Sequence, residues 1–311
     1  MAIPETQLET WSHQGAAVGS RDTYATVKGA LEARDTKYAN AGHAFEVFLQ
    51  GSYGNDTNIW AESDVDVVIR LDATYYYDAT ALTPQELATF QTGLFPITYL
   101  YADYKNDVVA ALKKKFGADV TPGNRAIKIK ANGARRSADV VVATEFRRYY
   151  SAISPLAMLA GLTWSIPLGP PQCERGICFF TPTGQVVNYP KQHSANCTAK
   201  HQATNGWFKP MVRILKNMRS KLVENGAIAE GSAPSYFLEG LLYNVPDDKF
   251  GTRYSDTFVA AMNWLFQANR TSFRCANKQQ DLIRDAVATC WPCADCDGFI
   301  NAAAALWNNW R

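Results

Sequence analysis

An apolar segment that stops at a Gly-Ser pair, followed by a second apolar segment that opens with two aspartates, is the feature that most constrains this chain. The first segment covers residues 45–49 and leads into Gly51 and Ser52. The second opens with Asp64 and Asp66 and continues as a β-branched run. Residues i and i+2 of a strand point to the same face. We therefore expect the two carboxylates to project together at the edge of a sheet.

This arrangement has the chemistry of a phosphate-handling site. Two carboxylates held so close repel each other unless a hard divalent cation bridges them to the phosphate oxygens of a substrate. Glycine lets the backbone approach a ligand closely, and nearby N–H groups and the Ser52 hydroxyl can hold a phosphate. An Asp-x-Asp pair alone is most often solvated or caps a turn. Its conjunction with the strands and the Gly-Ser turn favours a two-metal nucleotidyl transferase.

A third carboxylate opens another apolar strand, expected over residues 138–143. Asp139 has an alternative role as a turn cap. If its strand lies beside the one that opens with Asp64 and Asp66, Asp139 becomes a third metal ligand, which two-metal phosphoryl chemistry requires. It is then also the candidate to accept the proton of an attacking hydroxyl.

Length, charge and cysteine content limit the class of protein to which these motifs can belong. A length of 311 residues with 47% hydrophobic content suits one large or two intimately packed domains. The net charge of +2 gives no global basic field that would indicate nucleic acid. Seven cysteines without a secretory signal predict reduced thiols and a cytoplasmic protein. The apolar stretch Ile153–Trp164 is too short and interrupted to span a membrane.

The pattern of expected elements changes after Tyr150. Periodicity predicts helices over 21–40, 83–90 and 96–116, and strands over 44–50, 64–71, 125–130 (an edge strand) and 138–143. A hairpin is predicted over 176–189, followed by helices over 190–203, 206–224, 234–244, 255–271, 277–290 and 298–310. We therefore expect an α+β fold, with a catalytic core over residues 1–189, a helical domain over 190–311 and a cleft between them.

The helical half supplies further candidates. Lys209, Arg213 and Lys216 share one face of a helix, which is most often solvated surface but in a cleft would neutralise phosphates. Ser235 at a helix start can donate to a phosphate, and Tyr236 can stack on a nucleobase. Their alternative roles are an N-cap and a core aromatic residue.

These motifs resemble the cGAS/DncV-like nucleotidyltransferases, or CD-NTases, of the polymerase-beta-like superfamily. The resemblance covers about residues 20–270 and rests on Gln50-Gly51-Ser52, Asp64-Val65-Asp66, Asp139, Arg213-Ile-Leu-Lys216 and Pro234-Ser235-Tyr236. It implies a polymerase-beta-like core, a mixed twisted sheet flanked by helices, packed against a C-terminal helical domain. The run Asn188–Asn196 is also family-like, but it suggests no defined roles.

The resemblance also implies roles for the candidate residues. Two Mg²⁺ ions, or Mn²⁺, would be held by Asp64, Asp66 and Asp139. The donor NTP would be bound by Gln50, Gly51 and Ser52, with Lys216 and Ser235 on its phosphates and Tyr236 on its base. Bacterial members make cyclic di- and trinucleotides in anti-phage (CBASS) defence, so a downstream effector that responds to a cyclic nucleotide is expected.

Several alternatives remain open at this stage. The chain is expected to be a cyclic oligonucleotide synthase, a linear oligonucleotide synthase or a transferase acting on RNA or protein, or a catalytically silent nucleotide-binding module. Only the last would be expected to lack a metal carboxylate. The chain has no long basic stripe, so no obligatory DNA activator is expected, and the protein is expected to be a monomer.

One cysteine cluster has the spacing of metal ligands. Cys290, Cys293 and Cys296 lie at a break between helices. A Zn²⁺ site needs four ligands, so Cys275 or a histidine such as His193 or His201 would have to complete it. The alternatives are buried thiols or a disulfide formed on purification.

Overall fold

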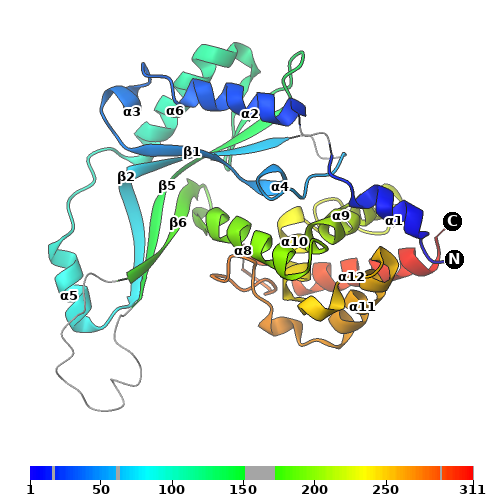
Figure 1. The fold of residues 1–311 in the computed structure, drawn as a ribbon. Helices are drawn as coiled ribbons and strands as arrows, with labels where there is room; N and C mark the ends of the chain where they lie inside the picture. The colour runs from blue at the N-terminus through cyan, green and yellow to red at the C-terminus, as the bar shows by residue number, and fades with distance from the viewer. Residues whose placement is uncertain (16–17, 61–63, 151–171, 288, 311) are drawn as a thin grey trace.

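A twisted sheet lies beside a bundle of helices in the computed structural model, which describes residues 1–15, 18–60, 64–150, 172–287 and 289–310 (Figure 1). The strands are β1 (Phe45–Leu49), β2 (Val65–Ala81), β3 (Val120–Pro122), β4 (Ile127–Ile129), β5 (Ala138–Tyr150), β6 (Gln172–Thr181) and β7 (Gly184–Asn188). Their order is β1-β2-β5-β4-β3, with β6 also pairing with β5, and β7 with β6. Strand β2 is antiparallel to β1 and parallel to β5, so the sheet is mixed as predicted.

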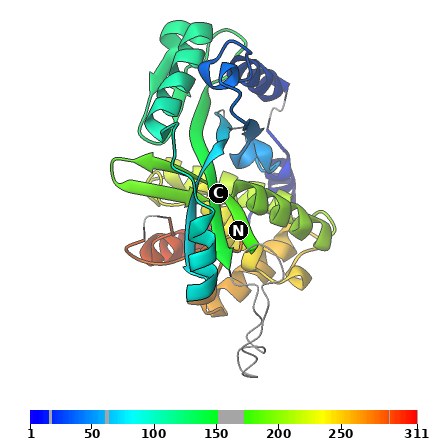
Figure 2. The same cartoon turned by 90° about the vertical axis from the view of Figure 1, so that its left-hand side faces the viewer.

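The helices fall into two groups. Those of the sheet half are α2 (Val18–Leu31), α3 (Lys37–Asn40), α4 (Gly51–Gly54), α5 (Pro84–Thr92) and α6 (Tyr101–Phe116). Those of the bundle are α1 (Glu5–Ser12), α8 (Pro190–Ala203), α9 (Phe208–Glu224), α10 (Ser235–Asn244), α11 (Tyr254–Gln267) and α12 (Cys293–Asn308). In both views α2 and α6 lie far from the bundle, on the other side of the sheet (Figures 1 and 2).

The two largest hydrophobic cores among the described residues support this arrangement. One lies under the sheet face that α2 and α6 cover, where Val27 and Val108 pack against Val67 and Val140. The other fills the helical bundle around the apolar stripe of α9. The predicted α+β fold is therefore confirmed. The bundle core also includes Leu8 of α1, so the first helix packs with the C-terminal helices although it belongs to the opposite end of the chain.

Two predicted helices are wrong. The helix expected over 21–40 is broken, because α2 ends at Leu31 and the side chain of Thr36 caps a separate α3. The Tyr38 hydroxyl donates to the Leu31 carbonyl at 2.6 Å, so both helices bury residues in one core and the apolar spacing continues across the break. Residues 277–287 and 289–290 form no helix, because their backbone groups bond in other patterns, among them Trp291 N–H to the Leu282 carbonyl at 2.8 Å and Leu282 N–H to the Phe273 carbonyl at 2.9 Å.

Smaller differences concern the sheet and the ends of helices. The predicted edge strand β4 lies between β5 and β3, so β3 is the edge. The helix predicted to start at residue 298 begins at Cys293, directly after Pro292. The predicted start of α5 is confirmed, with Thr83 and Glu86 forming a reciprocal capping box.

No helix among the described residues is long and apolar enough to cross a membrane. The apolar stretch Ile153–Trp164 singled out from the sequence lies outside the described residues.

Candidate active site

The three predicted carboxylates gather where β2 and β5 begin. In the parallel register Asp66 of β2 is the partner of Asp139 of β5, so the two residues sit side by side on neighbouring strands. Asp64 lies one residue before β2, exposed, and accepts a hydrogen bond from the Ser137 hydroxyl. The backbone strengthens this approach, because Val65 N–H donates to the Ser137 carbonyl at 3.0 Å. The strand adjacency expected from the sequence is therefore observed.

The electrostatics of this edge suit a cation. Burial raises the pKa of Asp139, the positive charge of Lys128 opposes that effect, and the negative charge of Asp64 adds to it. Lys128 is the register partner of Asp139 on β4. Carboxylate oxygens are the ligands that hard cations such as Mg²⁺ prefer, and a cation would relieve the repulsion between the acidic groups. The residues present therefore fit the predicted metal ions.

The Gly-Ser turn is held directly against one of these carboxylates. Gln50 precedes α4 in an extended conformation, and its N–H donates to the Asp66 carbonyl at 3.0 Å. Gly51 has a φ of +65°, and a Cβ at this position would lie 2.1 Å from Asp66 Oδ2. Only glycine meets both conditions, since it favours positive φ and has no side chain. Ser52 follows, 8% exposed.

A cavity of about 250 Å³ lies between the sheet and the helical bundle. It is lined from the sheet side by Gln50, Gly51, Ser52, Asn55, Asp66 and Asn188, and from the helical side by Pro190, His193, Ser235, Tyr236 and Glu239. Six of these residues were predicted from the sequence to bind a nucleotide or a metal ion. The predicted cleft between the two halves is thus present, and the acidic edge opens into it through Asp66.

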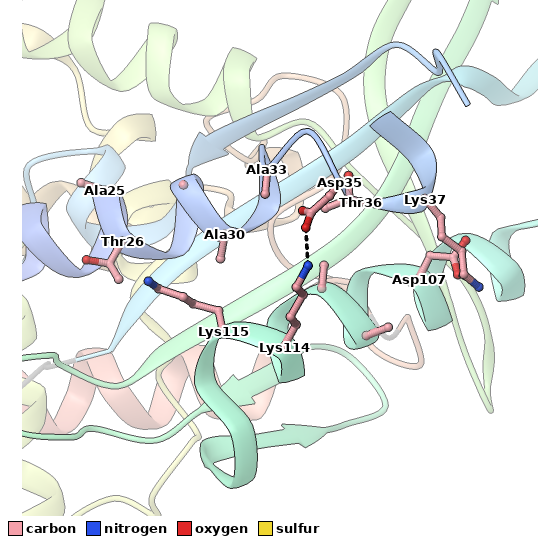
Figure 3. Close-up of a pocket in the computed structure, with 13 residues that line it drawn as sticks. Ala25, Thr26, Ala30, Ala33, Asp35, Thr36, Lys37, Asp107, Lys114 and Lys115 are labelled. Atoms are coloured by element: carbon pink, nitrogen blue, oxygen red, sulfur yellow. Dashed lines mark hydrogen bonds and ion pairs between the residues drawn. The ribbon is translucent and has the colours of Figure 1, made fainter. Parts of the chain in front are cut away.

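A larger hollow of about 700 Å³ lies elsewhere, between α2, α3 and α6 (Figure 3). Alanines line much of it, and its charges are arranged in pairs, with Lys114 bonded to Asp35 and Lys37 at 2.9 Å from Asp107. It contains none of the residues predicted for the site. The candidate site is therefore chosen by the chemistry of its lining and not by its volume.

Three residues of α10, Ser235, Tyr236 and Glu239, line the smaller cavity. The Tyr236 ring stacks on His193, with centroids 4.7 Å apart and an interplanar angle of 23°. The Tyr236 hydroxyl accepts from Asn277 Nδ2 at 2.9 Å, and burial raises the pKa of this tyrosine. Ser235 begins the helix, and its hydroxyl accepts from Arg219 at 3.1 Å. The N-cap position itself is Pro234, so the alternative role of Ser235 as an N-cap is wrong.

The basic stripe of α9 points at the loop that follows α4. Lys216 is fully buried, and its Nζ donates to the Thr57 carbonyl at 2.8 Å. Lys209 binds Asp56 Oδ2 at 3.0 Å, and Arg213 donates to the Asp56 carbonyl at 2.6 Å. The alternative that this stripe is solvated surface is wrong, because residues 56–57 cover it. The predicted contact of Lys216 with donor phosphates stays a prediction, since Lys216 is not among the residues that line the cavity.

The structure adds Asn55, Thr57, His193 and Glu239, which the sequence did not place in the site. Glu239 Oε2 lies 2.5 Å from His193 Nε2 and accepts from Asn55 Nδ2 at 3.0 Å, while Oε1 accepts from the Thr57 hydroxyl. A sequence signal existed, because Glu239 is the one charged residue in the apolar helix Ser235–Asn244.

The predicted zinc cluster is not formed. Among the described residues, the group whose side chains lie close enough to share a metal ion is His193, Cys197 and Glu239, and not Cys290, Cys293 and Cys296. All seven cysteines are free thiols in this structure, and Cys290 and Cys296 are buried, which favours the buried-thiol alternative. The cysteines are separated because Cys296 lies inside α12 and is buried, whereas Cys290 precedes the helix and contacts the Asp281 carbonyl.

Comparison with known proteins decides the family. A cyclic UMP-AMP synthase of Rhodothermus marinus is 38% identical over 319 residues, which span 100% of this chain and 99% of that protein. The cyclic nucleotide synthase CdnE01 of Staphylococcus haemolyticus is 33% identical across 100% of both chains. Residues 195–308 match the family model of the cGAS/DncV-like nucleotidyltransferase C-terminal helical domain. The chain belongs to the cGAS/DncV-like nucleotidyltransferases.

Solved structures of CD-NTases have the same fold. The Rhodothermus marinus CdnE c-UMP-AMP synthase with Apcpp and Upnpp superposes with a TM-score of 0.84 at 38% identity, covering 99% of this chain and 97% of that one. The Elizabethkingia meningoseptica CdnE cyclic dinucleotide synthase with GTP and Apcpp gives 0.76 at 27% identity, covering 99% and 100%. The family resemblance and the expected fold are therefore confirmed.

Proposed function

We propose that this CD-NTase joins two nucleoside triphosphates into a cyclic dinucleotide. The observation that carries the proposal is the cavity lined by Gly51, Ser52 and Asp66 on one side and by Ser235 and Tyr236 on the other. Polar and acidic groups at one end and an aromatic ring at the other match the phosphates and the base of a nucleotide. The relatives named as cyclic UMP-AMP and cyclic dipurine nucleotide synthases support a ring of two nucleotides.

In the proposed reaction a 2′- or 3′-hydroxyl of one nucleotide attacks the α-phosphorus of the other. A new P–O bond forms, the bond to the bridging oxygen breaks, and pyrophosphate leaves. The linear intermediate then turns in the same cavity, and a second attack of the same kind closes the ring. No side-chain nucleophile is needed, so the protein contributes positioning and charge.

Each group of residues has a proposed part in this reaction. Asp64, Asp66 and Asp139 would hold two Mg²⁺ ions, or Mn²⁺, whose charge offsets that of the phosphates and lowers the pKa of the attacking hydroxyl. Asp139 would help to accept the hydroxyl proton. The Gly51-Ser52 turn would hold the donor phosphates, since glycine allows close backbone approach.

We further propose that the product is a second messenger in anti-phage (CBASS) signalling and acts on a downstream effector. The family resemblance supports this role, and the net charge of +2 supports synthesis without an obligatory DNA activator. Phage plating on cells that express the native chain or Asp64→Ala/Asp66→Ala tests it. Equal plating efficiency on both strains would contradict a catalytic role in defence.

The test of the reaction uses purified protein with all four NTPs, singly and mixed, each labelled at the α-phosphate, with Mg²⁺ or Mn²⁺. Products are treated with phosphatase and identified by mass spectrometry. A phosphatase-resistant cyclic dinucleotide that the Asp64→Ala/Asp66→Ala variant does not make is expected. Linear, phosphatase-sensitive products alone, or a ring of three nucleotides, would contradict the proposal.

A further inference from the structure

A single buried carboxylate connects the two ends of the cavity. Glu239 of α10 is 2% exposed, yet both of its oxygens are occupied by side chains from other elements. Asn55 and Thr57 reach it from the loop after α4, and His193 reaches it from α8. These three partners are themselves buried. A buried carboxylate with three donors is a strong, directional anchor, because charge-assisted hydrogen bonds are about twice as strong as neutral ones.

The partners of Glu239 in the loop hold the Gly-Ser turn through their backbones. Asn55 N–H donates to the Gly51 carbonyl at 3.1 Å, and Thr57 N–H donates to the Ser52 carbonyl at 2.9 Å. Asp56, between them, has a φ of +56°, a strained conformation for a residue with a side chain. Contacts from outside the loop must therefore maintain its shape, and the side-chain bonds to Glu239 are among them.

The third partner connects Glu239 to the aromatic end of the cavity. The His193 ring bonds to Glu239 through Nε2 and stacks on Tyr236. Moving Glu239 would therefore shift both the turn predicted to hold phosphates and the ring predicted to stack on a base. The carboxylate is charged at neutral pH: burial raises its pKa, but the hydrogen bond and charge of His193 and the charge of Lys216 lower it below the ordinary value overall.

A metal ion does not account for this cluster as well as hydrogen bonds do. Cys197 lies near His193 and Glu239, but burial raises the pKa of its thiol well above the ordinary value, which disfavours the thiolate that binds metals. The Glu239 oxygens are already engaged by protein donors.

We infer that Glu239 is a positioning residue that sets the Gly51-Ser52 turn at a fixed distance from the Tyr236 ring. The inference rests on the proposed function, since it assumes a nucleotide that spans the cavity. We therefore expect loss of the carboxylate to weaken nucleotide binding and to slow turnover by more than its effect on stability explains. A carboxylate that only supported the fold would affect activity in proportion to stability.

The experiment compares Glu239→Gln with Glu145→Gln. Glu145 is also buried and paired, with Arg147 at 2.6 Å and Arg175 at 2.7 Å, but it lies outside the cavity. For each variant we would measure the Kd of α,β-methylene ATP and α,β-methylene UTP with Mg²⁺, the kcat and KM for NTPs, and the thermal midpoint. Hydrogen exchange of residues 50–58 reports the order of the turn directly.

We expect Glu239→Gln to lower kcat/KM by about 10²-fold, as small displacements of positioned reactants do. Exchange at 50–58 should become faster while α10 stays protected. Glu145→Gln should lower the thermal midpoint and leave Kd, kcat and KM unchanged. If Glu239→Gln does not fold, Thr57→Val removes one donor and keeps the shape of the side chain. It should change the same constants in the same direction.

The inference is overturned if both Glu239→Gln and Thr57→Val bind the analogues and turn over like the native protein, or if Glu145→Gln lowers activity equally. A native protein that makes no cyclic product would refute the proposed function alone. Analogue binding and hydrogen exchange would still decide the role of Glu239, since neither depends on ring closure.

Discussion

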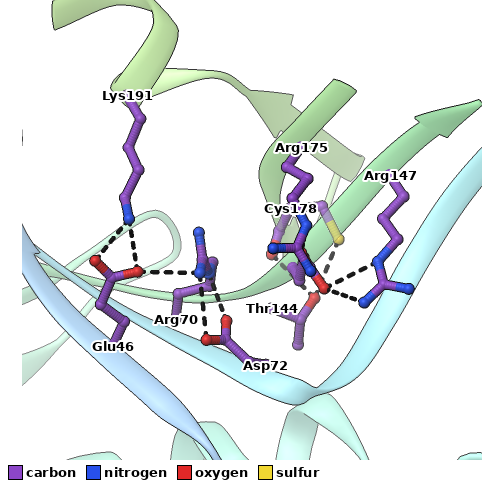
Figure 4. A network of polar contacts seen from close by, with 9 residues as sticks. Glu46, Arg70, Asp72, Thr144, Arg147, Arg175, Cys178 and Lys191 are labelled. Carbon is purple, nitrogen blue, oxygen red and sulfur yellow. Dashed lines mark hydrogen bonds and ion pairs between the residues drawn. The ribbon is translucent and has the colours of Figure 1, made fainter. Parts of the chain in front are cut away.

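Strands β2 and β5 carry acidic residues both at their starts and farther along, and these two levels of the sheet differ in the charges that surround them. Farther along the strands the carboxylates are paired with arginines. Glu145 forms ion pairs with Arg147 at 2.6 Å and with Arg175 at 2.7 Å. Both arginines are labelled in Figure 4, together with Arg70 and Asp72. Arg70 binds Asp72 at 2.5 Å in the same network, which also includes an ion pair between β1 and α8. These charges are balanced within the protein.

At the start of the same strands, carboxylates face carboxylates. Asp66 and Asp139 are register partners, and burial together with the charge of Asp64 raises the pKa of Asp139 against the opposing charge of Lys128. Charge balance is thus built into the middle of the sheet, whereas its edge concentrates negative charge beside the cavity. We propose that the carboxylates paired with arginines hold the fold, and that the acidic edge at the strand starts binds a cation and a substrate. Variants at the two levels should therefore have opposite effects on activity and stability.

The largest expected effect is at the acidic edge. Asp66→Asn should lower turnover at least about 10³-fold, which corresponds to roughly 4 kcal/mol, because a metal-ligand carboxylate is lost. Stability should stay the same or rise slightly, since repulsion between carboxylates is relieved. Single-turnover rates and thermal melting measure the two quantities. Turnover within tenfold of the native rate would show that Asp66 holds no essential metal ion.

The paired level should respond in the opposite way. Glu145→Gln should lower the free energy of unfolding by about 3 kcal/mol, the low end for breaking a buried ion pair, because Arg175 is 62% exposed. The rate at saturating NTP should not change. Urea denaturation gives the free energy, and a steady-state assay gives the rate. A large loss of turnover without a loss of stability would remove the distinction between the two levels.

The Gly-Ser turn offers a test of geometry rather than charge. Gly51→Ala should lower kcat/KM by about 10²-fold, because the added Cβ would lie 2.1 Å from Asp66 Oδ2 and displace it. Gly29→Ala in α2 is the matched control, since nothing lies within 4 Å of its added Cβ. That control should stabilise the helix by about 1 kcal/mol and leave the kinetics unchanged. Equal kinetics for both variants would mean that the close approach of Gly51 is not required.

A variant of Lys216 tests whether this buried cation stabilises the fold or binds the phosphates of a nucleotide. Lys216→Met should lower stability by about 1–3 kcal/mol, because it leaves the buried Thr57 carbonyl without its donor. Chemical denaturation measures this loss. A higher KM at native stability would instead indicate direct contact with donor phosphates, as the family resemblance implies.

The smallest effect concerns pH and Glu239. Its pKa is lowered in the folded state from an ordinary 4.5, so its contribution to stability is complete above that pH and is lost as pH falls through the folded-state pKa. The difference in free energy of unfolding between the native protein and Glu239→Gln should therefore shrink below about pH 4.5. A difference that is constant from pH 7 to pH 4 would show that the charge of Glu239 does not stabilise the fold.

The sequence was most informative where structure is local. Side chains of a strand alternate with a fixed period, so the apolar runs placed the starts of β2 and β5 to within one residue, and with them Asp66 and Asp139. That β2 and β5 are neighbours was an expectation from the chemistry of their aspartates, and the observed register confirms it. Helix starts with chemical signals, such as Thr83 before Pro84, were also predictable.

The tertiary structure decided what depends on contacts between distant segments. Lys209 and Lys216 look like a solvated stripe in sequence, but they are buried because the loop at residues 56–57, about 150 residues away in the chain, packs on them. Glu239 acquires its partners in the same way, from residues up to 184 positions away. Periodicity fixes which face a residue occupies on its own helix or strand. It carries no information on what that face meets, and that contact determines whether a charge binds a ligand or holds the fold.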